Sequence, residues 1–137
     1  INNGVYQCGF ATTQEAYDRA SSLVRQGLDR CEQLLQMQPY LCGQQFTDIF
    51  LLPTMLRFDA VYAPLFGAGG SRHWRLAVDF PHIHQWMNRC WQDIPGVATS
   101  IDLQDASRSY YQQLFPLNPG GIVPSVPMTP QRLGLEE

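Results

Sequence analysis

The chain has 137 residues, of which 45% are hydrophobic, and its formal net charge is −3 at neutral pH. This length suits a single domain with a full-sized hydrophobic core. The weakly acidic balance gives no electrostatic case for binding nucleic acid or an anionic membrane surface. We find no apolar run long enough to span a bilayer and no charged-then-apolar leader, so we expect a cytoplasmic protein.

The cysteine content favours free thiols. The four cysteines are widely spaced, at Cys8, Cys31, Cys42 and Cys90. An even number could form two disulfides, but a chain with a full-sized core does not need them. Because free cysteine is among the most buried residue types, we expect reduced and mostly buried thiols. No Cys-x-x-Cys or Cys-Pro pair occurs, so no redox or zinc motif is visible.

The two ends of the chain differ from its middle. Residues 1–11 read as an extended lead-in to a long helix, and a domain that opens in this way opens in mid-protein, so we expect further polypeptide in front of Ile1. From Pro116 onward, repeated proline and glycine forbid regular structure. This tail either wraps the helices or is disordered beyond about Pro127, and we expect residues 125–137 to be disordered.

The first long helix is predicted over about 13–37, because apolar residues recur there at helical spacing. The apolar positions are Ala16, Ala20, Leu23, Val24, Leu28, Cys31, Leu34 and Leu35. Thr12 and Glu15 have the spacing of a capping box at its start, and Pro39 ends it. Gly27 lies on the apolar face and costs roughly 1 kcal/mol relative to alanine, so we expect a second helix to approach closely there.

A central buried helix is predicted over 49–58, which is apolar nearly all round. Thr47 or Asp48 would cap it, and Pro53 removes one helical hydrogen bond and bends it. Residues 67–71, rich in glycine, are predicted to form a flexible loop.

Two further helices complete the pattern. One starts at Pro81, which suits the first turn of a helix, and Pro95 and Gly96 close it. Its apolar stripe is Ile83, Trp86, Met87, Cys90, Trp91 and Ile94. The last runs from Asp102 through Phe115, with Leu103, Ala106, Tyr110 and Leu114 in register. The sequence therefore predicts an all-α helical bundle with an irregular tail.

Six short motifs together point to one family. They are Asn2–Ala11 (NNGVYQCGFA), Tyr40–Gly43 (YLCG), Arg57–Asp59 (RFD), Ile94–Val97 (IPGV), Tyr110–Tyr111 (YY) and Asn118–Pro124 (NPGGIVP). The chain resembles the C-terminal helical domain of glutathionyl-hydroquinone reductases, enzymes related to omega-class glutathione transferases. The resemblance covers nearly the whole chain, so we expect a glutathione-transferase C-terminal-like domain over residues 1–124, with residues 1–12 as its lead-in.

The resemblance implies a two-domain enzyme that uses glutathione as co-substrate. A thioredoxin-like N-terminal domain binds glutathione and carries a nucleophilic cysteine in a Cys-Pro context. The helical domain supplies much of the pocket for the hydroquinone. The reaction removes glutathione from a glutathionyl-hydroquinone with a second glutathione, giving hydroquinone and oxidised glutathione. Family dimers form largely through the helical domain, so the resemblance also implies a homodimer.

The chain departs from the family pattern in three places. No thioredoxin-like half is present and no cysteine precedes a proline, so we expect no catalytic residue in this chain and no bound glutathione. The family's Thr-Glu-Ala-Asp cap appears as Thr47-Asp48, two residues shorter, which should change that helix end. The loop over about 67–78 is longer than the family's and lacks its basic cluster, which puts a partner contact there in doubt.

By resemblance, Tyr6 and Tyr110 contact the hydroquinone. A phenol both donates and accepts a hydrogen bond, and its ring can stack on a quinol. Tyr110 and Tyr111 lie about 100° apart on a helix and cannot share a face; Tyr110 falls in the apolar register and could also deliver a proton. The structural alternatives are an anchoring aromatic at Tyr6 and a core tyrosine with a satisfied hydroxyl at Tyr110.

Arg57 is the third substrate-binding candidate, because it interrupts an apolar helix. A buried charge needs a partner, and Asp48 or Asp59 could supply it. A structural ion pair or a dimer contact is the simpler interpretation of Arg57.

The histidines do not indicate a metal. Residues two apart on a helix face nearly opposite sides, so His82 and His84 cannot chelate together, and His73 lies in a loop. The tryptophans Trp74, Trp86 and Trp91 are expected to be packing residues.

Two function classes, with a weaker third, follow from these observations. The first is the hydroquinone-binding domain of a glutathionyl-hydroquinone reductase, inactive without its thioredoxin-like half, which a separate polypeptide could supply. The second is a stand-alone dimerising or partner-binding module without catalysis, since a lost domain would uncover an apolar face. The third is a domain that binds planar phenols in its aromatic pocket.

Overall fold

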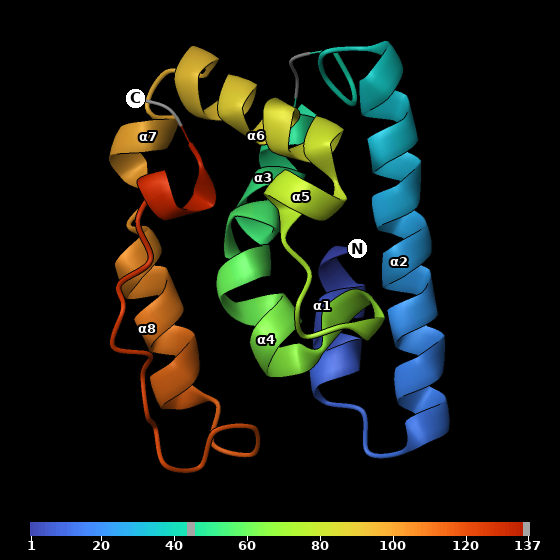
Figure 1. Ribbon diagram of the computed structural model, residues 1–137, viewed down its shortest axis with the longest axis vertical. Coiled ribbons are helices and arrows are strands. Elements are labelled where there is room, and N and C mark those ends of the chain that lie inside the picture. Colours follow the sequence, from blue (N-terminus) through green and yellow to red (C-terminus); the bar gives the residue numbers. More distant parts are fainter. Residues whose placement is uncertain (44–45, 136–137) are drawn as a thin grey trace.

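The computed structural model describes residues 1–43 and 46–135, and in that part of the chain the regular elements are all helical. In chain order they are α1 (Asn2–Gly9), α2 (Gln14–Met37), α3 (Phe46–Arg57), the π-helix η1 (Phe58–Tyr62), α4 (Ala63–Phe66), the 3₁₀-helix η2 (Ala68–Gly70), α5 (Leu76–Asp79), α6 (Pro81–Asp93), α7 (Val97–Ser100), α8 (Leu103–Gln113) and the 3₁₀-helix η3 (Gln131–Leu133). The predicted all-α bundle is confirmed. Figure 1 shows α2 along one side, α3, η1 and α4 through the centre, and α8 with the C-terminal tail along the other side.

The chain begins with a helix, so the extended lead-in predicted for residues 1–12 is wrong over Asn2–Gly9. Val5 and Cys8 are buried one turn apart on the face that packs against α2. A side chain at Gly4 would lie 2.6 Å from Val24 Cγ2, so the glycine permits the two helices to touch. Tertiary packing therefore overrides the weak helix propensity of the asparagines and glycine at the start.

Helix α2 begins one residue later than the capping-box spacing suggested. The N-cap is Thr13, whose Oγ1 accepts a hydrogen bond from the Ala16 amide at 3.2 Å. Glu15 instead forms an ion pair with Arg19, one turn along the helix, so the predicted box of Thr12 and Glu15 is wrong. The close approach predicted at Gly27 is confirmed: a Cβ there would lie 2.7 Å from Cγ1 of Ile1, the N-cap of α1.

The central helix contains Pro53, as predicted, and then changes from α to π geometry over Phe58–Tyr62. Asp48 near its start is fully buried and accepts hydrogen bonds from the Leu41 amide at 2.8 Å and from Trp86 Nε1 at 2.8 Å. One carboxylate thus joins the α2–α3 connection to α6. The capping role predicted for the Thr47 side chain lies outside the described residues.

The helical run Asp48–Phe66 has a mean hydropathy of 1.4 and is long enough to cross a membrane by length and composition. The expectation that no such run exists is therefore wrong. Half of this run is buried inside the structure, and a central core helix of a helical bundle meets the same two criteria.

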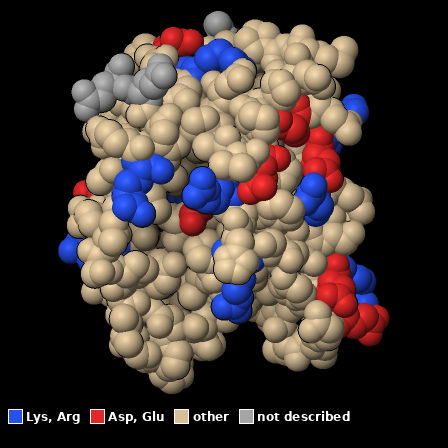
Figure 2. All heavy atoms as spheres, in the orientation of Figure 1, with Lys and Arg blue, Asp and Glu red and all other residues tan. Residues whose placement is uncertain are grey.

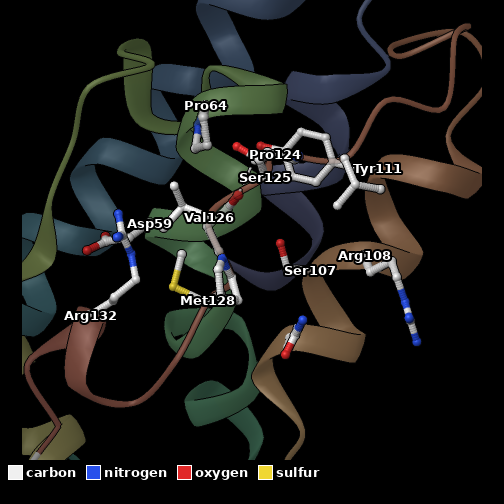
Figure 3. A pocket seen from close by; sticks show the side chains of 14 residues that line it. Asp59, Pro64, Ser107, Arg108, Tyr111, Pro124, Ser125, Val126, Met128 and Arg132 are labelled. Atoms are coloured by element: carbon white, nitrogen blue, oxygen red, sulfur yellow. Dashed lines mark hydrogen bonds between the residues drawn. The ribbon is translucent and has the colours of Figure 1, made fainter.

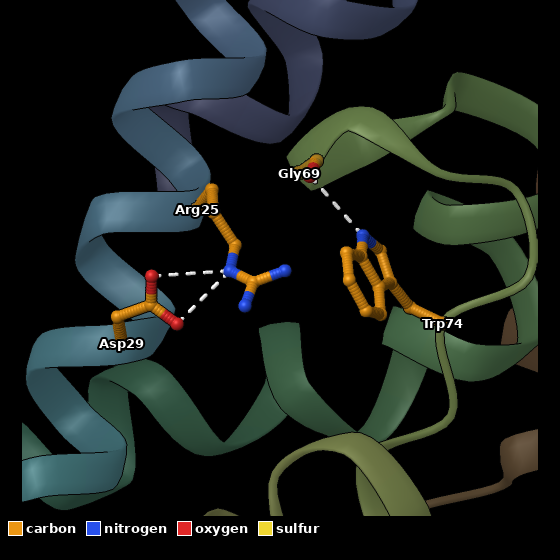
Figure 4. A network of polar contacts seen from close by, with 4 residues as sticks. All are labelled: Arg25, Asp29, Gly69 and Trp74. Carbon is orange, nitrogen blue, oxygen red and sulfur yellow. Dashed lines mark hydrogen bonds and ion pairs between the residues drawn. The ribbon is translucent and has the colours of Figure 1, made fainter.

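The glycine-rich segment predicted as a flexible loop over 67–71 forms the short helix η2, and Ala68 is completely buried. Trp74 holds it by donating a hydrogen bond from Nε1 to the Gly69 carbonyl at 3.1 Å. The Arg25 guanidinium of α2 lies 4.5 Å from the centre of the Trp74 ring, and its Nε donates to Asp29 at 2.9 Å (Figure 4). This cation–π contact fastens the segment to α2.

The C-terminal tail does not match the disorder predicted for residues 125–137. In its described part, up to residue 135, Leu133 and Leu135 are buried. His84 Nε2 hydrogen-bonds the Leu133 carbonyl at 2.7 Å, which fastens η3 to α6. These two leucines near the far end of the tail supply apolar burial that a search for regular periodicity does not detect.

Candidate functional site

Three tyrosine hydroxyl groups from three separate elements meet at one point. The Tyr6 and Tyr110 hydroxyl oxygens lie 2.5 Å apart, those of Tyr62 and Tyr110 lie 2.8 Å apart, and those of Tyr6 and Tyr62 lie 3.1 Å apart. We call these three residues the tyrosine cluster. The sequence predicted two of its members, Tyr6 and Tyr110, and the structure brings them together across 104 positions of the chain.

Helices α1, η1 and α8 each contribute one tyrosine, and the Phe66 ring of α4 packs beneath them. The Phe66 ring centre lies 5.5 Å from that of Tyr62 and 5.9 Å from that of Tyr6. A Cβ at Gly9 would lie 2.6 Å from Phe66 Cγ, so this glycine lets α1 come close enough for Tyr6 to join the cluster. Tilted aromatic packing of this kind fixes ring positions.

The cluster runs from the interior to the surface. Tyr62 is 2% exposed, Tyr110 is intermediate, and Tyr6 is 40% exposed. Burial raises the pKa of Tyr62 far above its usual value, and its hydrogen bonds to Tyr110 and Tyr6 raise it further. Burial also raises the pKa of Tyr110, as does its hydrogen bond to Tyr6, while Tyr62 lowers it. Tyr62 and Tyr110 therefore remain neutral phenols near pH 7, able to donate and to accept hydrogen bonds.

Sequence reasoning missed Tyr62. It lies in a π-helix, which periodicity does not reveal, and such single-turn irregularities are frequent at functional sites. One signal was present, because a hydroxyl inside the apolar run from Phe58 to Phe66 needs a hydrogen-bonding partner.

Arg57 lies at the junction of α3 and η1, but without the carboxylate partner that was expected. Asp48 binds the backbone and Trp86, and Asp59 accepts from the Leu76 amide at 3.0 Å. The Arg57 Nη1 group donates to the Pro53 carbonyl at 3.1 Å, and its buried Nε has no partner among the residues described. Its positive charge lowers the pKa of Tyr110, so Arg57 acts on the cluster through its field.

A family model described as "Glutathione S-transferase, C-terminal domain" matches residues 14–89. The chain belongs to this family. The match includes α2 to α5 and the first nine residues of α6, which confirms the fold expected from the resemblance. The matched range carries Tyr62 and Arg57, whereas Tyr6 and Tyr110 lie outside it.

Two named relatives give a more specific comparison. The chain is 40% identical to "Glutathione S-transferase omega-like 2" of Schizosaccharomyces pombe, in a match that spans 93% of this chain and 41% of that protein. It is 38% identical to "Glutathionyl-hydroquinone reductase YqjG" of Escherichia coli, covering 90% of itself and 37% of the relative. The domain thus spans about 40% of the length of the curated relatives it matches.

Solved structures agree. The crystal structure of the glutathione S-transferase Xi from Phanerochaete chrysosporium superposes with a TM-score of 0.83 at 35% identity, over 93% of this chain and 43% of that one. The glutathione-bound structure of YqjG from Escherichia coli gives 0.81 at 37% identity, over 94% of this chain and 41% of that one.

The histidines and cysteines of this transferase domain do not form a shared site among the residues described. His82 Nδ1 lies 2.7 Å from Glu32 Oε1, and His84 binds the tail, so the two histidines turn to different elements. All four cysteines are free. Burial raises the pKa of Cys90 to about 12 and also raises that of Cys8. Neither is activated as a nucleophile, because the attacking species is the thiolate.

Proposed function

We propose that the chain is the hydroquinone-binding domain of a glutathionyl-hydroquinone reductase, acting as a cytoplasmic homodimer and inactive on its own. The observation that carries the proposal is the tyrosine cluster, with two hydroxyls 2.5 Å apart at an edge where Tyr6 is 40% exposed. The relatives named as glutathionyl-hydroquinone reductases support the substrate class.

The hydrogen-bond order of the cluster supports a donor role for Tyr6. Tyr62 is buried, and Tyr6 and Tyr110 are the two groups to which its hydroxyl is bonded. In each pair of hydroxyls either oxygen can be the donor. We assign the Tyr62 proton to Tyr110 and the Tyr110 proton to Tyr6, the order in which the buried hydroxyl donates toward the surface. Tyr6 accepts from its neighbours and keeps its own proton for a ligand oxygen.

A bound quinol would accept a hydrogen bond from the Tyr6 hydroxyl and would also feel the positive charge of Arg57. A hydrogen bond to a phenolic oxygen stabilises the charge that develops there as the sulfur leaves the ring. The positive charge of Arg57 acts in the same direction. The exposed Tyr6 ring, supported from beneath by the Phe66 ring, gives the planar substrate an aromatic surface.

The thiol chemistry must then come from a second domain. The buried thiols of Cys8 and Cys90, whose pKa values burial raises, support that view, and the glutathione-bound structure of YqjG shows that a relative binds glutathione. We propose a thioredoxin-like domain as the partner, in the same or a separate polypeptide. We do not place glutathione on the residues described here.

The test joins the chain to the thioredoxin-like segment of the Escherichia coli relative and measures glutathione-dependent reduction of a glutathionyl-hydroquinone. We expect activity in the fusion and none in the chain alone. Tyr6→Phe and Tyr110→Phe should each lower kcat/KM by about 10- to 100-fold.

The matched control is Tyr40→Phe. This change removes a hydroxyl that bonds Asp93 at the opposite end of the bundle, and it should leave the rate of the fusion unchanged. An active fusion in which all three variants behave alike would contradict the proposal. Full activity of the chain without any partner would also contradict it.

A partner-binding module without catalysis remains the second candidate, since a groove at α1 and α2 is lined by two exposed apolar side chains, Phe10 (47%) and Leu23 (61%). Light scattering of the chain separates the two proposals. A monomer that neither self-associates nor binds the thioredoxin-like segment rules out the module. A dimer that stays inactive when the segment is supplied favours it.

A further inference from the structure

A second hollow lies under the C-terminal tail. It has a volume of about 450 Å³, and its walls come from η1, α4, α8 and the tail. Figure 3 shows Asp59 and Arg132 on one side of it, Ser107 and Arg108 on the other, and the tail residues Val126 and Met128 between them. Pockets of roughly 300–1,000 Å³ are the usual size for small organic ligands.

This tail pocket and the tyrosine cluster lie on different sides of α8, although η1 and α8 contribute residues to both. On α8, Tyr110 belongs to the cluster and Tyr111 lines the pocket, as their separation of about 100° around the helix requires. The Tyr111 hydroxyl donates to the Ala60 carbonyl at 3.1 Å. That bond ties α8 to η1 and keeps the wall of the pocket in place.

Free hydrogen-bond donors dominate the polar part of the pocket. The side chains of Gln104, Ser107 and Arg132 line it, and none of them has a hydrogen bond or ion pair within the described residues. Arg108 pairs with Asp105 at 2.8 Å. On the face in Figure 2, acidic side chains gather chiefly along the α2 side, away from the tail.

The single carboxylate of the pocket is already engaged. Both Asp59 oxygens accept from the Leu76 amide, at 3.0 and 3.2 Å. Ala60, Pro64 and Met128 supply apolar surface beside the donors. A donor-rich rim next to an apolar slot is complementary to an acceptor-rich group on a flat apolar body.

We propose that the tail pocket is a binding site for small aromatic carboxylates, with Arg132 and Ser107 holding the carboxylate and the ring lying against Met128. The site does not depend on the function proposed for the tyrosine cluster. Arginine is suited to this role because its planar guanidinium matches a carboxylate with two parallel hydrogen bonds.

The test titrates the ¹⁵N-labelled chain with naphthalene-2-carboxylate and follows backbone amide shifts. Naphthalen-2-ylmethylammonium and naphthalene-2-methanol serve as the cationic and neutral probes of the same shape. We expect the carboxylate to shift amides of residues 104–111 and 122–132 with a dissociation constant below about 1 mM. The ammonium and the alcohol should bind at least about 5-fold more weakly.

Three variants locate the contact. Arg132→Gln should weaken carboxylate binding by about 3- to 10-fold, and Ser107→Phe, which fills the slot, should abolish it. Asp59→Asn removes the nearby negative charge and should leave binding unchanged or tighter. The matched control is Arg72→Gln, an exposed arginine on another wall of the molecule.

Several results would overturn the proposal. One is equal or tighter binding of the ammonium probe, together with its loss in Asp59→Asn. Another is a shift pattern centred on the tyrosine cluster at residues 6, 62 and 110. A third is carboxylate binding that neither Arg132→Gln nor Ser107→Phe changes while the amide spectra of both variants remain those of the folded chain.

Discussion

The carboxyl group of Asp59 is largely buried from solvent. Burial raises its pKa from 3.8 to about 6, although the Leu76 amide and the charges of His84 and Arg75 oppose the rise. Because the folded-state pKa lies above the unfolded one, this group's stabilising contribution is fully present below about pH 4. It is then lost as the pH rises through 6.

Replacing Asp59 with asparagine keeps an acceptor for the Leu76 amide and removes the charge. We therefore expect Asp59→Asn to become more stable relative to the parent chain as the pH rises from 4 to 7, by at most about 3 kcal/mol. Urea unfolding at four pH values measures the difference. Asp18→Asn, at an exposed site on α2, is the control and should show no such trend; a flat difference for Asp59→Asn would contradict the prediction.

For the tyrosine cluster we predict that two substitutions shift the pKa of Tyr110 in opposite directions. The Tyr6 hydroxyl raises the pKa of Tyr110, while the Tyr62 hydroxyl lowers it. Tyr6→Phe should therefore lower the pKa of Tyr110, and Tyr62→Phe should raise it, because one change removes its acceptor and the other its donor. NMR titration of ¹³C-labelled tyrosine ring carbons reads each residue separately. Shifts of the same sign would show that the proton order inferred for the cluster is wrong.

Among the elements, long periodic helices could be predicted from the sequence, whereas short and irregular ones could not. Helix α6 buries most of the apolar stripe that its spacing indicates, including Trp86 and Cys90. Helix α2 buries half of its stripe but exposes Leu23, and α8 fully buries only Leu103. Helix α1 was missed because its stability comes from packing on α2 rather than from propensity. The family resemblance named Tyr6 and Tyr110 as candidates, but the π-helix that contributes Tyr62 leaves no periodic trace in the sequence.

Alanine substitutions at Gly9 and Gly27 test which contacts hold α1 in place. A methyl group at Gly9 would lie 2.6 Å from Phe66 Cγ and about as close to two more ring atoms, and the buried ring cannot move away. At Gly27 the obstacle is the Ile1 side chain, which is only partly buried. We expect Gly9→Ala to cost about 1–3 kcal/mol. Gly27→Ala should cost less, since gaining alanine in a helix interior offsets about 1 kcal/mol.

Chemical denaturation of the two variants measures this difference, and the amide shift of Tyr6 reports whether the cluster is displaced. We expect Gly9→Ala to disturb Tyr6 and Gly27→Ala to leave it in place. If Gly27→Ala proved the more destabilising change, the contact between α1 and α4 would not be the one that positions the cluster.

At the scale of the whole molecule, the tail closes the bundle. It runs beside α8 and ends against α6 (Figure 1), where Leu133 and Leu135 are buried and Asn88 Nδ2 donates to the Gly134 carbonyl at 3.1 Å. The tail pocket exists because this segment crosses over α8 and η1. Proline and glycine content predicted the lack of regular structure there, but it did not predict the anchor at the far end.

Removing that anchor should loosen the tail without unfolding the helices. Leu133→Ala deletes a side chain that is 5% exposed, so we expect a loss of about 2–3 kcal/mol and a melting temperature lower by roughly 5–10 °C. Ile122→Ala, at a site 75% exposed in the same tail, should cost less than about 0.5 kcal/mol. Hydrogen exchange locates the effect: in Leu133→Ala, amides around residues 132–135 should exchange faster while those of α2 keep their protection. Equal losses in the two variants would mean that the tail does not rest on its C-terminal leucines.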